Sequence, residues 1–225
     1  SPALGAGTVF SSPSTCTTSS SAMRYPMRYL FLIVFLSCSL PALAAQNILV
    51  FGDSLSAGYG IPQAAAWPSL LQQRLKEKRL DYNVVNQSIS GETTAGGRAR
   101  LPEALARHKP AIVILALGAN DGLRGLPLTQ LQANLTAMVT AAKRQGARVV
   151  LVGMRLPPNY GPYARQFAAA FAPIARAHQI PLVDFLLADI ADQPTMFQAD
   201  GLHPTAAAQA RILDNVWPVL APLLR

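Results

Sequence analysis

The chain has 225 residues, a length that accommodates one globular domain with extensions. Its composition is 51% hydrophobic and 13% charged, with a formal net charge of +8 at pH 7. A basic chain can bind nucleic acid or an anionic membrane, but its one dense basic run, residues 74–79, ends a predicted helix and contains no aromatic residue. We therefore expect no nucleic-acid partner and, at most, peripheral contact with an anionic membrane.

Residues 1–22 contain no charged residue and no periodic apolar face, and many of them are serine or threonine. Such a segment buries too little surface to offset its chain entropy. We expect it to be disordered or an artefact of the assigned start site, with initiation at Met23 or Met27.

Residues 23–44 have the order of a secretory signal peptide. Two arginines precede an apolar run over residues 29–36, and an A-x-A cleavage motif follows at residues 42–44. The alternative is a transmembrane anchor, but the run is well short of the roughly 20 residues that span a bilayer. We expect cleavage after Ala44, which would send residues 45–225 to the periplasm or outside the cell.

Both cysteines, Cys16 and Cys38, lie before the expected cleavage site. The mature chain would therefore have no disulfide, and its hydrophobic core would have to stabilise it. Residues 35–38 (FLSC) faintly resemble a lipoprotein cleavage box, which leaves lipidation of Cys38 as an alternative.

From residue 46 onward, short apolar runs alternate with longer helical patterns. The expected strands are residues 47–51, 81–86, 111–117, 148–152 and 180–184. The expected helices are residues 67–79, 99–107, 128–145, 163–178 and 206–220, the last of them broken near Pro218. This alternation predicts a three-layer α/β/α sandwich around a parallel sheet of about five strands. In such sheets, ligands bind beyond the carboxyl ends of the strands.

A candidate nucleophile, Ser54, follows the first expected strand, after Gly52 and Asp53. At the end of a strand, a serine presents its hydroxyl at the ligand-binding edge, and its own N–H can stabilise an oxyanion. The alternative is that Asp53 or Ser54 is an ordinary helix N-cap.

Two further segments offer hydrogen-bond donors at the same edge. Gly91 follows the second strand and allows close approach of its backbone N–H. Asn120 follows the third strand, and its uncharged amide suits an oxygen that becomes negative in a transition state. Taken alone, each segment also fits an ordinary turn.

A candidate base, His203, follows the last strand. Asp200 lies three residues before it, across a tight turn at Gly201. This spacing lets the carboxylate accept from the imidazole Nδ1–H, which leaves Nε2 as the base.

Four blocks at four strand ends resemble the SGNH (GDSL) hydrolase family. They are residues 52–56 (GDSLS), Gly91, residues 118–121 (GAND) and residues 200–204 (DGLHP). The chain resembles most its secreted bacterial esterase branch, which contains acyl-CoA thioesterases, arylesterases and lysophospholipases. The resemblance implies a flavodoxin-like SGNH hydrolase fold and an acyl-enzyme on Ser54.

The resemblance also implies the roles of the other candidates. Ser54, His203 and Asp200 would form the catalytic triad, and the oxyanion hole would consist of Ser54, Gly91 and Asn120. Small-molecule esters, thioesters or lysophospholipids would be the substrates of a monomer that uses no metal and no cofactor. No G-x-S-x-G motif is present, which disfavours the larger α/β-hydrolase fold.

The loop after Asn120 carries the candidate substrate-binding residues Asp121, Leu123 and Leu126. Because Asn120 would contact the carbonyl oxygen, these leucines are expected to line the acyl chain and to favour medium chains over acetyl. One alternative is that they only fill the core. Two alternative functions are an envelope carbohydrate deacetylase of the same fold and a non-enzymatic basic module that binds envelope components.

Overall fold

A computed structural model describes residues 7–12, 14, 15 and 45–224. The chain divides into two units, residues 1–43 and 44–225, which are described separately. The described residues of the first unit are exposed and contain no helix or strand. The expected signal peptide, residues 23–44, lies outside the described residues. No helix in the described part of the chain is long and apolar enough to cross a membrane.

In the second unit, five parallel strands form one sheet in the order β2-β1-β3-β4-β5. Val50 pairs with Ile114, and Leu115 pairs with Leu151, so the most apolar runs lie side by side in the centre. The strands are β1 (Gln46–Gly52), β2 (Tyr82–Asn86), β3 (Ile112–Ala116), β4 (Arg148–Val152) and β5 (Leu182–Val183). The predicted parallel sheet is confirmed.

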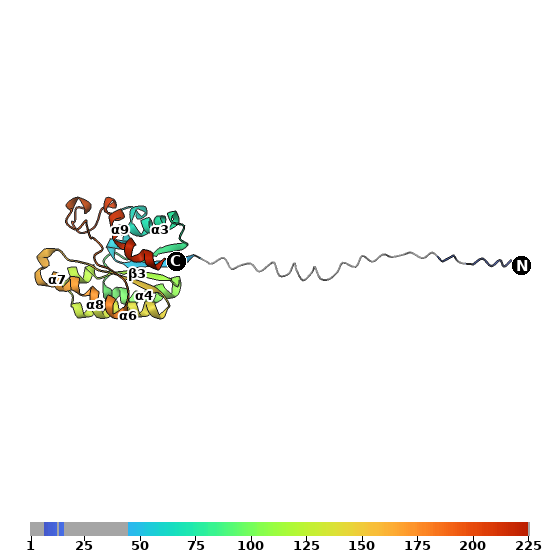
Figure 1. Cartoon of the computed structure of the whole chain (residues 1–225), viewed down its shortest axis with the longest axis horizontal. Coiled ribbons are helices and arrows are strands. Elements are labelled where there is room, and N and C mark those ends of the chain that lie inside the picture. Colours follow the sequence, from blue (N-terminus) through green and yellow to red (C-terminus); the bar gives the residue numbers. More distant parts are fainter. Residues whose placement is uncertain (1–6, 13, 16–44, 225) are drawn as a thin grey trace, which may run out of the picture. The chain divides into compact units, whose positions relative to one another are not determined.

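Helices cover both faces of the sheet (Figure 1). One layer consists of α3 (Trp67–Glu77) and α9 (Gln209–Leu220), which pack against each other. The opposite layer contains α4 (Thr94–His108), α6 (Leu128–Arg144) and α8 (Phe171–His178). Both faces of β3 are therefore buried, as its continuous apolar sequence predicts.

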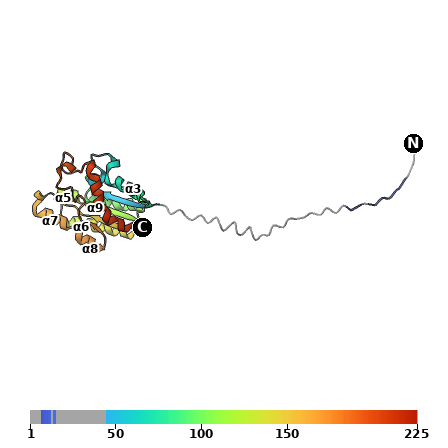
Figure 2. The ribbon, with the colours of Figure 1, turned by 45° about the horizontal axis from the view of Figure 1, so that its top comes forward.

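Short elements occupy the connections, and Figure 2 shows α5 and α7 beside the main layers. The helices in these connections are α2 (Ser54–Ala57), α5 (Ala119–Leu123) and α7 (Gly161–Ala169). Single 3₁₀ turns lie at Gln63–Ala65, Pro158–Tyr160, Pro194–Met196, Ala206–Ala208 and Ala221–Leu223. Two of the short helices, α2 and α5, begin just beyond the carboxyl ends of β1 and β3.

Two of the expected helices differ clearly from the structure in their extent. The helix expected over 163–178 is two helices that meet at Ala170, because Pro173 has no N–H to donate to the carbonyl of Ala169. Helix α4 begins at Thr94 rather than near residue 99. Its Gly97, which discourages a helix locally, packs so closely that a Cβ there would lie 2.4 Å from Leu117 Cδ1.

The last helix also differs, because α9 continues through Pro218 to Leu220 instead of breaking there. Pro218 is exposed, whereas Val216 and Leu220 are fully buried. Burial of these two side chains keeps the helix in place although the proline removes one backbone hydrogen bond.

Candidate active site

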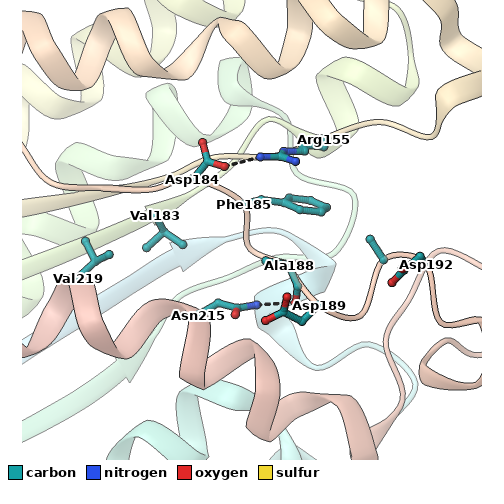
Figure 3. Close-up of a pocket in the computed structure, with 10 residues that line it drawn as sticks. Arg155, Val183, Asp184, Phe185, Ala188, Asp189, Asp192, Asn215 and Val219 are labelled. Carbon is teal, nitrogen blue, oxygen red and sulfur yellow. Dashed lines mark hydrogen bonds and ion pairs between the residues drawn. The ribbon is translucent and has the colours of Figure 1, made fainter.

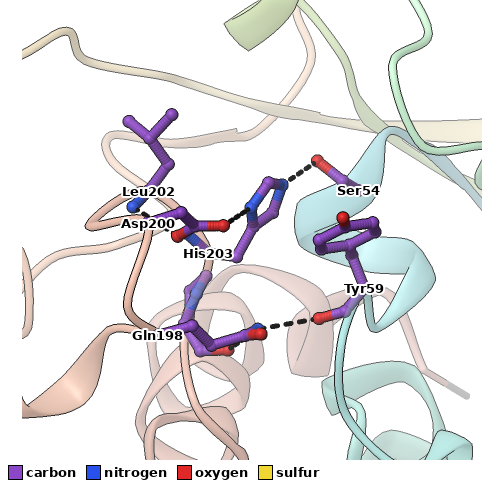
Figure 4. Close-up of polar contacts among 7 residues, drawn as sticks. Ser54, Tyr59, Gln198, Asp200, Leu202 and His203 are labelled. Atoms are coloured by element: carbon purple, nitrogen blue, oxygen red, sulfur yellow. Dashed lines mark hydrogen bonds and ion pairs between the residues drawn. The ribbon is translucent and has the colours of Figure 1, made fainter.

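A chain of hydrogen bonds joins Ser54 at the start of α2 to the loop that precedes α9 (Figure 4). Ser54 Oγ lies 2.9 Å from His203 Nε2, and His203 Nδ1 lies 2.6 Å from Asp200 Oδ2. The three side chains that the sequence singled out for a triad are therefore in contact. Ser54 and His203 are 149 residues apart in the chain, so only the fold brings them together.

Asp200 is held by its own turn as well as by the imidazole. Its Oδ1 accepts from the backbone N–H of Leu202 at 2.9 Å and of His203 at 3.0 Å. These hydrogen bonds lower the pKa of Asp200 to about 2. The backbone N–H of His203 contributes most to this shift, and the His203 ring contributes the next largest part. An ionised Asp200 accepts from Nδ1–H of the neutral imidazole, which leaves Nε2 free to accept from the Ser54 hydroxyl.

Asp53, the residue before Ser54, is the N-cap of α2. Its Oδ1 accepts from the backbone N–H of Leu55 at 3.0 Å, so the N-cap alternative raised by the sequence is correct for Asp53. The side chain is fully buried, and Oδ2 has no hydrogen-bond partner in the described part of the chain. Burial raises the pKa of Asp53 to about 7. Ser54 follows the cap, and this leaves its hydroxyl free to face His203.

The two other candidate oxyanion donors follow β2 and β3, with Gly91 in a turn and Asn120 in α5. Gly91 has a φ of +81°, in the left-handed region that favours glycine, and its N–H donates to no acceptor among residues 45–224. Asn120 Nδ2 donates to the backbone carbonyl of Glu92 at 3.0 Å. That bond fixes the orientation of the amide and joins α5 to the turn after β2. Because Ser54 is the first residue of α2, its N–H has no helical acceptor either.

Asp121 was expected to bind substrate, but the structure places it in the protein interior, only 3% exposed. Its carboxylate accepts from the backbone N–H of Thr94 at 2.8 Å and from the Thr94 hydroxyl at 2.5 Å. Asn134 of α6 donates to the same hydroxyl at 3.2 Å. Asp121 therefore joins α5 to α4 and, through Thr94, to α6, and it does not line the cavity described next.

A cavity of about 630 Å³ opens beside Ser54, Asn120 and His203. Leu123 lines it, as the sequence predicted, whereas Leu126 does not. The Leu126 carbonyl instead accepts from the Tyr163 hydroxyl at 2.7 Å. Most of the remaining wall is apolar and is formed by Leu55, Leu156, Phe185, Leu187, Phe197 and Leu202. A cavity of this character suits a hydrocarbon chain attached to a carbonyl group near Ser54.

Sequence reasoning missed the walls that come from the loops after β4 and β5. The Arg155 guanidinium forms an ion pair with Asp184 and lies 5.0 Å from the centre of the Phe185 ring, so it joins the two loops. Their place in the sequence could have predicted these walls, because both loops follow strands that end at the same edge of the sheet. Arg155 and Phe185 also line a neighbouring cavity of about 490 Å³, shown in Figure 3, which is not lined by Ser54 or His203.

No metal site accompanies this cavity in the part of the chain that the structure describes. There, no three or more histidine, cysteine, aspartate or glutamate side chains are grouped so as to hold a metal ion. The polar groups beside Ser54 are instead those of acyl transfer, namely a hydroxyl, an imidazole with its carboxylate, and uncharged N–H donors.

Residues 50–211 match the GDSL-like lipase/acylhydrolase family. The chain is 52% identical over 182 residues to Esterase TesA of Pseudomonas aeruginosa, covering 80% of this chain and 90% of that protein. It is 39% identical over 202 residues to Thioesterase 1/protease 1/lysophospholipase L1 of Escherichia coli K12, covering 89% of this chain and 94% of that protein.

Among solved structures, the chain is similar to the psychrotrophic esterase EstA from Pseudoalteromonas sp., inhibited by monoethylphosphonate. The TM-score is 0.75 with 39% sequence identity, and the match covers 79% of this chain and 97% of that one. The sequence match, the shared fold and the four sequence blocks at the carboxyl edge of the sheet all indicate the same family. The chain therefore belongs to the GDSL-like lipase/acylhydrolase family.

Proposed function

We propose that this chain is a serine hydrolase that cleaves carboxylic esters and thioesters through an acyl-enzyme on Ser54. The observation that carries the proposal is the continuous hydrogen-bonded chain from Ser54 Oγ through His203 to Asp200, at 2.9 and 2.6 Å. The names of the relatives, an esterase and a thioesterase/lysophospholipase, support the same chemistry.

In the acylation step, Ser54 Oγ bonds to the acyl carbonyl carbon while its proton passes to His203 Nε2. The electron pair of the carbonyl double bond moves to the oxygen. When this tetrahedral intermediate collapses, the bond to the alcohol oxygen or thiol sulfur breaks, and His203 gives its proton to the leaving group. Asp200, ionised at neutral pH because its pKa is about 2, stabilises the imidazolium that forms in between.

The oxyanion of this intermediate would be bound by three N–H groups. They belong to the backbones of Ser54 and Gly91 and to the side chain of Asn120. One N–H of the Asn120 amide is used by the Glu92 carbonyl, which leaves the second for the oxyanion. Removal of a single donor of this kind typically lowers turnover by about 10²- to 10³-fold.

Deacylation repeats these steps with water as the nucleophile. His203 Nε2 takes a proton from the water as its oxygen bonds to the acyl carbon. Collapse of the second intermediate breaks the bond to Ser54 Oγ, which recovers its proton from His203. The products are a carboxylic acid and the free enzyme, so the balance needs no cofactor or metal.

The cavity supports substrates with an acyl chain longer than acetyl, because five leucines and two phenylalanines contribute to its wall. Simple esters, acyl thioesters and lysophospholipids all place such a chain beside a carbonyl group. The alternative, an envelope deacetylase, would place only a methyl group on the acyl side of the carbonyl, and a methyl group would leave most of these apolar side chains without a contact.

Hydrolysis of p-nitrophenyl esters and of acyl-CoA thioesters tests the proposal, with Ser54→Ala as the test variant. Ser54→Ala should lose at least about 10³-fold in kcat, since the nucleophile is gone. Ser69→Ala removes an exposed hydroxyl that donates to the Gln63 carbonyl and should leave activity unchanged. A phosphonate probe should add to Ser54, as seen by peptide mass spectrometry. Activity or labelling that survives in Ser54→Ala would disprove the proposal.

We also propose that the chain is exported, on the basis of the basic, apolar and A-x-A order of residues 23–44. Expression in a Gram-negative host followed by intact-mass analysis of the periplasmic fraction should find Ala45 as the first residue. A product that begins at a lipid-modified Cys38 would replace this with the lipoprotein alternative.

A further inference from the structure

Besides the triad, a second set of contacts joins the loop that carries His203 to the loop that follows Ser54 (Figure 4). Gln198 Nε2 donates to the backbone carbonyl of Tyr59 at 2.8 Å and to that of Pro204 at 3.1 Å. The Gln198 backbone N–H donates to the His203 carbonyl at 2.8 Å. Gln198 therefore bonds to His203 and Pro204 in its own loop and to Tyr59, which lies 139 positions earlier in the chain.

The backbone around Gly60 is shaped to receive this amide. Gly60 has a φ of +72°, and a Cβ at this position would lie 2.1 Å from Gln198 Oε1. Only a residue without a side chain lets the carboxamide lie so close to the chain. Because Nε2 faces two carbonyl oxygens, the site requires a donor of two hydrogens, which a glutamine amide supplies.

Tyr59 makes a second contact with the same histidine. Its ring centroid lies 4.4 Å from that of His203, with an angle of 39° between the planes. Both ring nitrogens of His203 are already engaged, one by Asp200 and the other by Ser54. Tyr59 therefore restrains the imidazole through its ring surface. An aromatic ring in that place also favours the imidazolium that acyl transfer produces.

Few hydrogen bonds join these two loops. Within residues 45–224, residues 53–60 and 198–204 share two hydrogen bonds, Ser54 with His203 and Gln198 with Tyr59. The Ser54 bond breaks and reforms in every catalytic cycle, whereas the Gln198 bond does not take part in the chemistry. Asp200 holds His203 from within its own turn, so it cannot fix the position of that turn relative to Ser54.

We infer that Gln198 and Tyr59 are positioning residues for His203, which hold the imidazole at attack distance from Ser54 throughout the reaction. The inference rests on the proposed function and deepens it. Neither residue lines the cavity beside Ser54, so they would act on the geometry of proton transfer and not on substrate binding. Small displacements of a catalytic group lower turnover steeply, by as much as about 100-fold for 1 Å.

The test compares kcat and KM for p-nitrophenyl butyrate in two pairs of variants. Gln198→Met keeps the size of the side chain and removes its donors, and kcat should fall about 10-fold with KM unchanged. Its matched control is Gln132→Met, which removes a 3.3 Å hydrogen bond from Gln132 Nε2 to the carbonyl of Ala170, 38 residues later in the chain. This control should retain wild-type kcat.

The second pair isolates the ring of Tyr59, whose hydrogen bond to Gln198 uses only its backbone. Tyr59→Leu should lower kcat roughly 3-fold at constant KM, whereas Tyr59→Phe, which keeps the ring, should match the wild type. Tyr59 is 52% exposed, so we expect both of its variants to fold even if Gln198→Met does not. Melting temperatures of all variants are measured in parallel.

Wild-type kcat in both Gln198→Met and Tyr59→Leu would overturn the inference, as would a change confined to KM. Equal losses in Gln198→Met and Gln132→Met, or in Tyr59→Leu and Tyr59→Phe, would overturn it too. Failure of the proposed function is distinguishable, because in that case the wild type itself would lack hydrolysis that depends on Ser54.

Discussion

At the scale of single residues, the buried carboxyl of Asp53 makes stability depend on pH. Burial raises its pKa to about 7 from the ordinary 3.8, and the charges of Asp121 and Glu92 act in the same direction. Between these values the unfolded chain loses the proton while the folded chain keeps it, so the free energy of unfolding falls as pH rises from about 4 to 7.

Asp53→Asn should remove this dependence, because asparagine has the same shape, stays neutral and can still cap α2. In urea unfolding, variant and wild type should have similar stabilities at pH 4. The variant should become the more stable one as pH approaches 7, with the difference growing by up to about 1.4 kcal/mol for each rise of one in pH. A stability difference that is the same at every pH from 4 to 8 would contradict this account of Asp53.

At the scale of elements, the contact of Asp121 with Thr94 joins α5 to α4. Asp121→Asn keeps only one acceptor oxygen where the carboxylate accepts from both the backbone N–H and the hydroxyl of Thr94. One buried donor is then unpaired, and we expect a loss of about 1–3 kcal/mol in the free energy of unfolding.

Urea unfolding at pH 7 measures this loss. Asp192→Asn is the control, since Asp192 is exposed and forms no ion pair among the described residues. If both variants unfold at the same urea concentration as the wild type, the Asp121 contact does not stabilise the helices.

At the scale of the whole molecule, the cavity is built by loops from four strands, and its wall should set the preference for acyl-chain length. Each methylene buried there contributes up to about 0.8 kcal/mol, so kcat/KM should rise from acetyl to medium chains. Leu123→Ala should move this profile, because Leu123 lines the cavity.

Leu126→Ala is the matched control for this prediction. Leu126 lies three residues away but outside the cavity, so its removal should leave the profile of p-nitrophenyl esters from two to twelve carbons unchanged. Equal shifts in both variants would show that the loop acts as a whole. A profile already highest for acetyl would instead favour the deacetylase alternative.

The contrast between these two leucines illustrates what sequence reasoning reached in the site. Ser54, Asp200 and His203 could be selected as candidates because each follows an expected strand, and parallel strands bring their carboxyl ends to one edge. The structure places these three side chains in contact. Asp121 and Leu123 lie in α5 and Leu126 follows it closely, and nothing in their local sequence indicates which side chain faces the cavity. Their directions depend on α4 and on Tyr163, which are distant in the chain.

The sequence by itself determined the alternation of strands and helices, the parallel sheet and the family, since hydrophobic periodicity and short motifs are local signals. Tertiary structure alone decided the burial of Asp121, the cavity walls after β4 and β5, and the contact of Gln198 with Tyr59. Each of these depends on segments tens to more than a hundred residues apart. The physical reason is that packing and hydrogen bonding between distant segments, rather than local propensity, set the direction of a loop side chain.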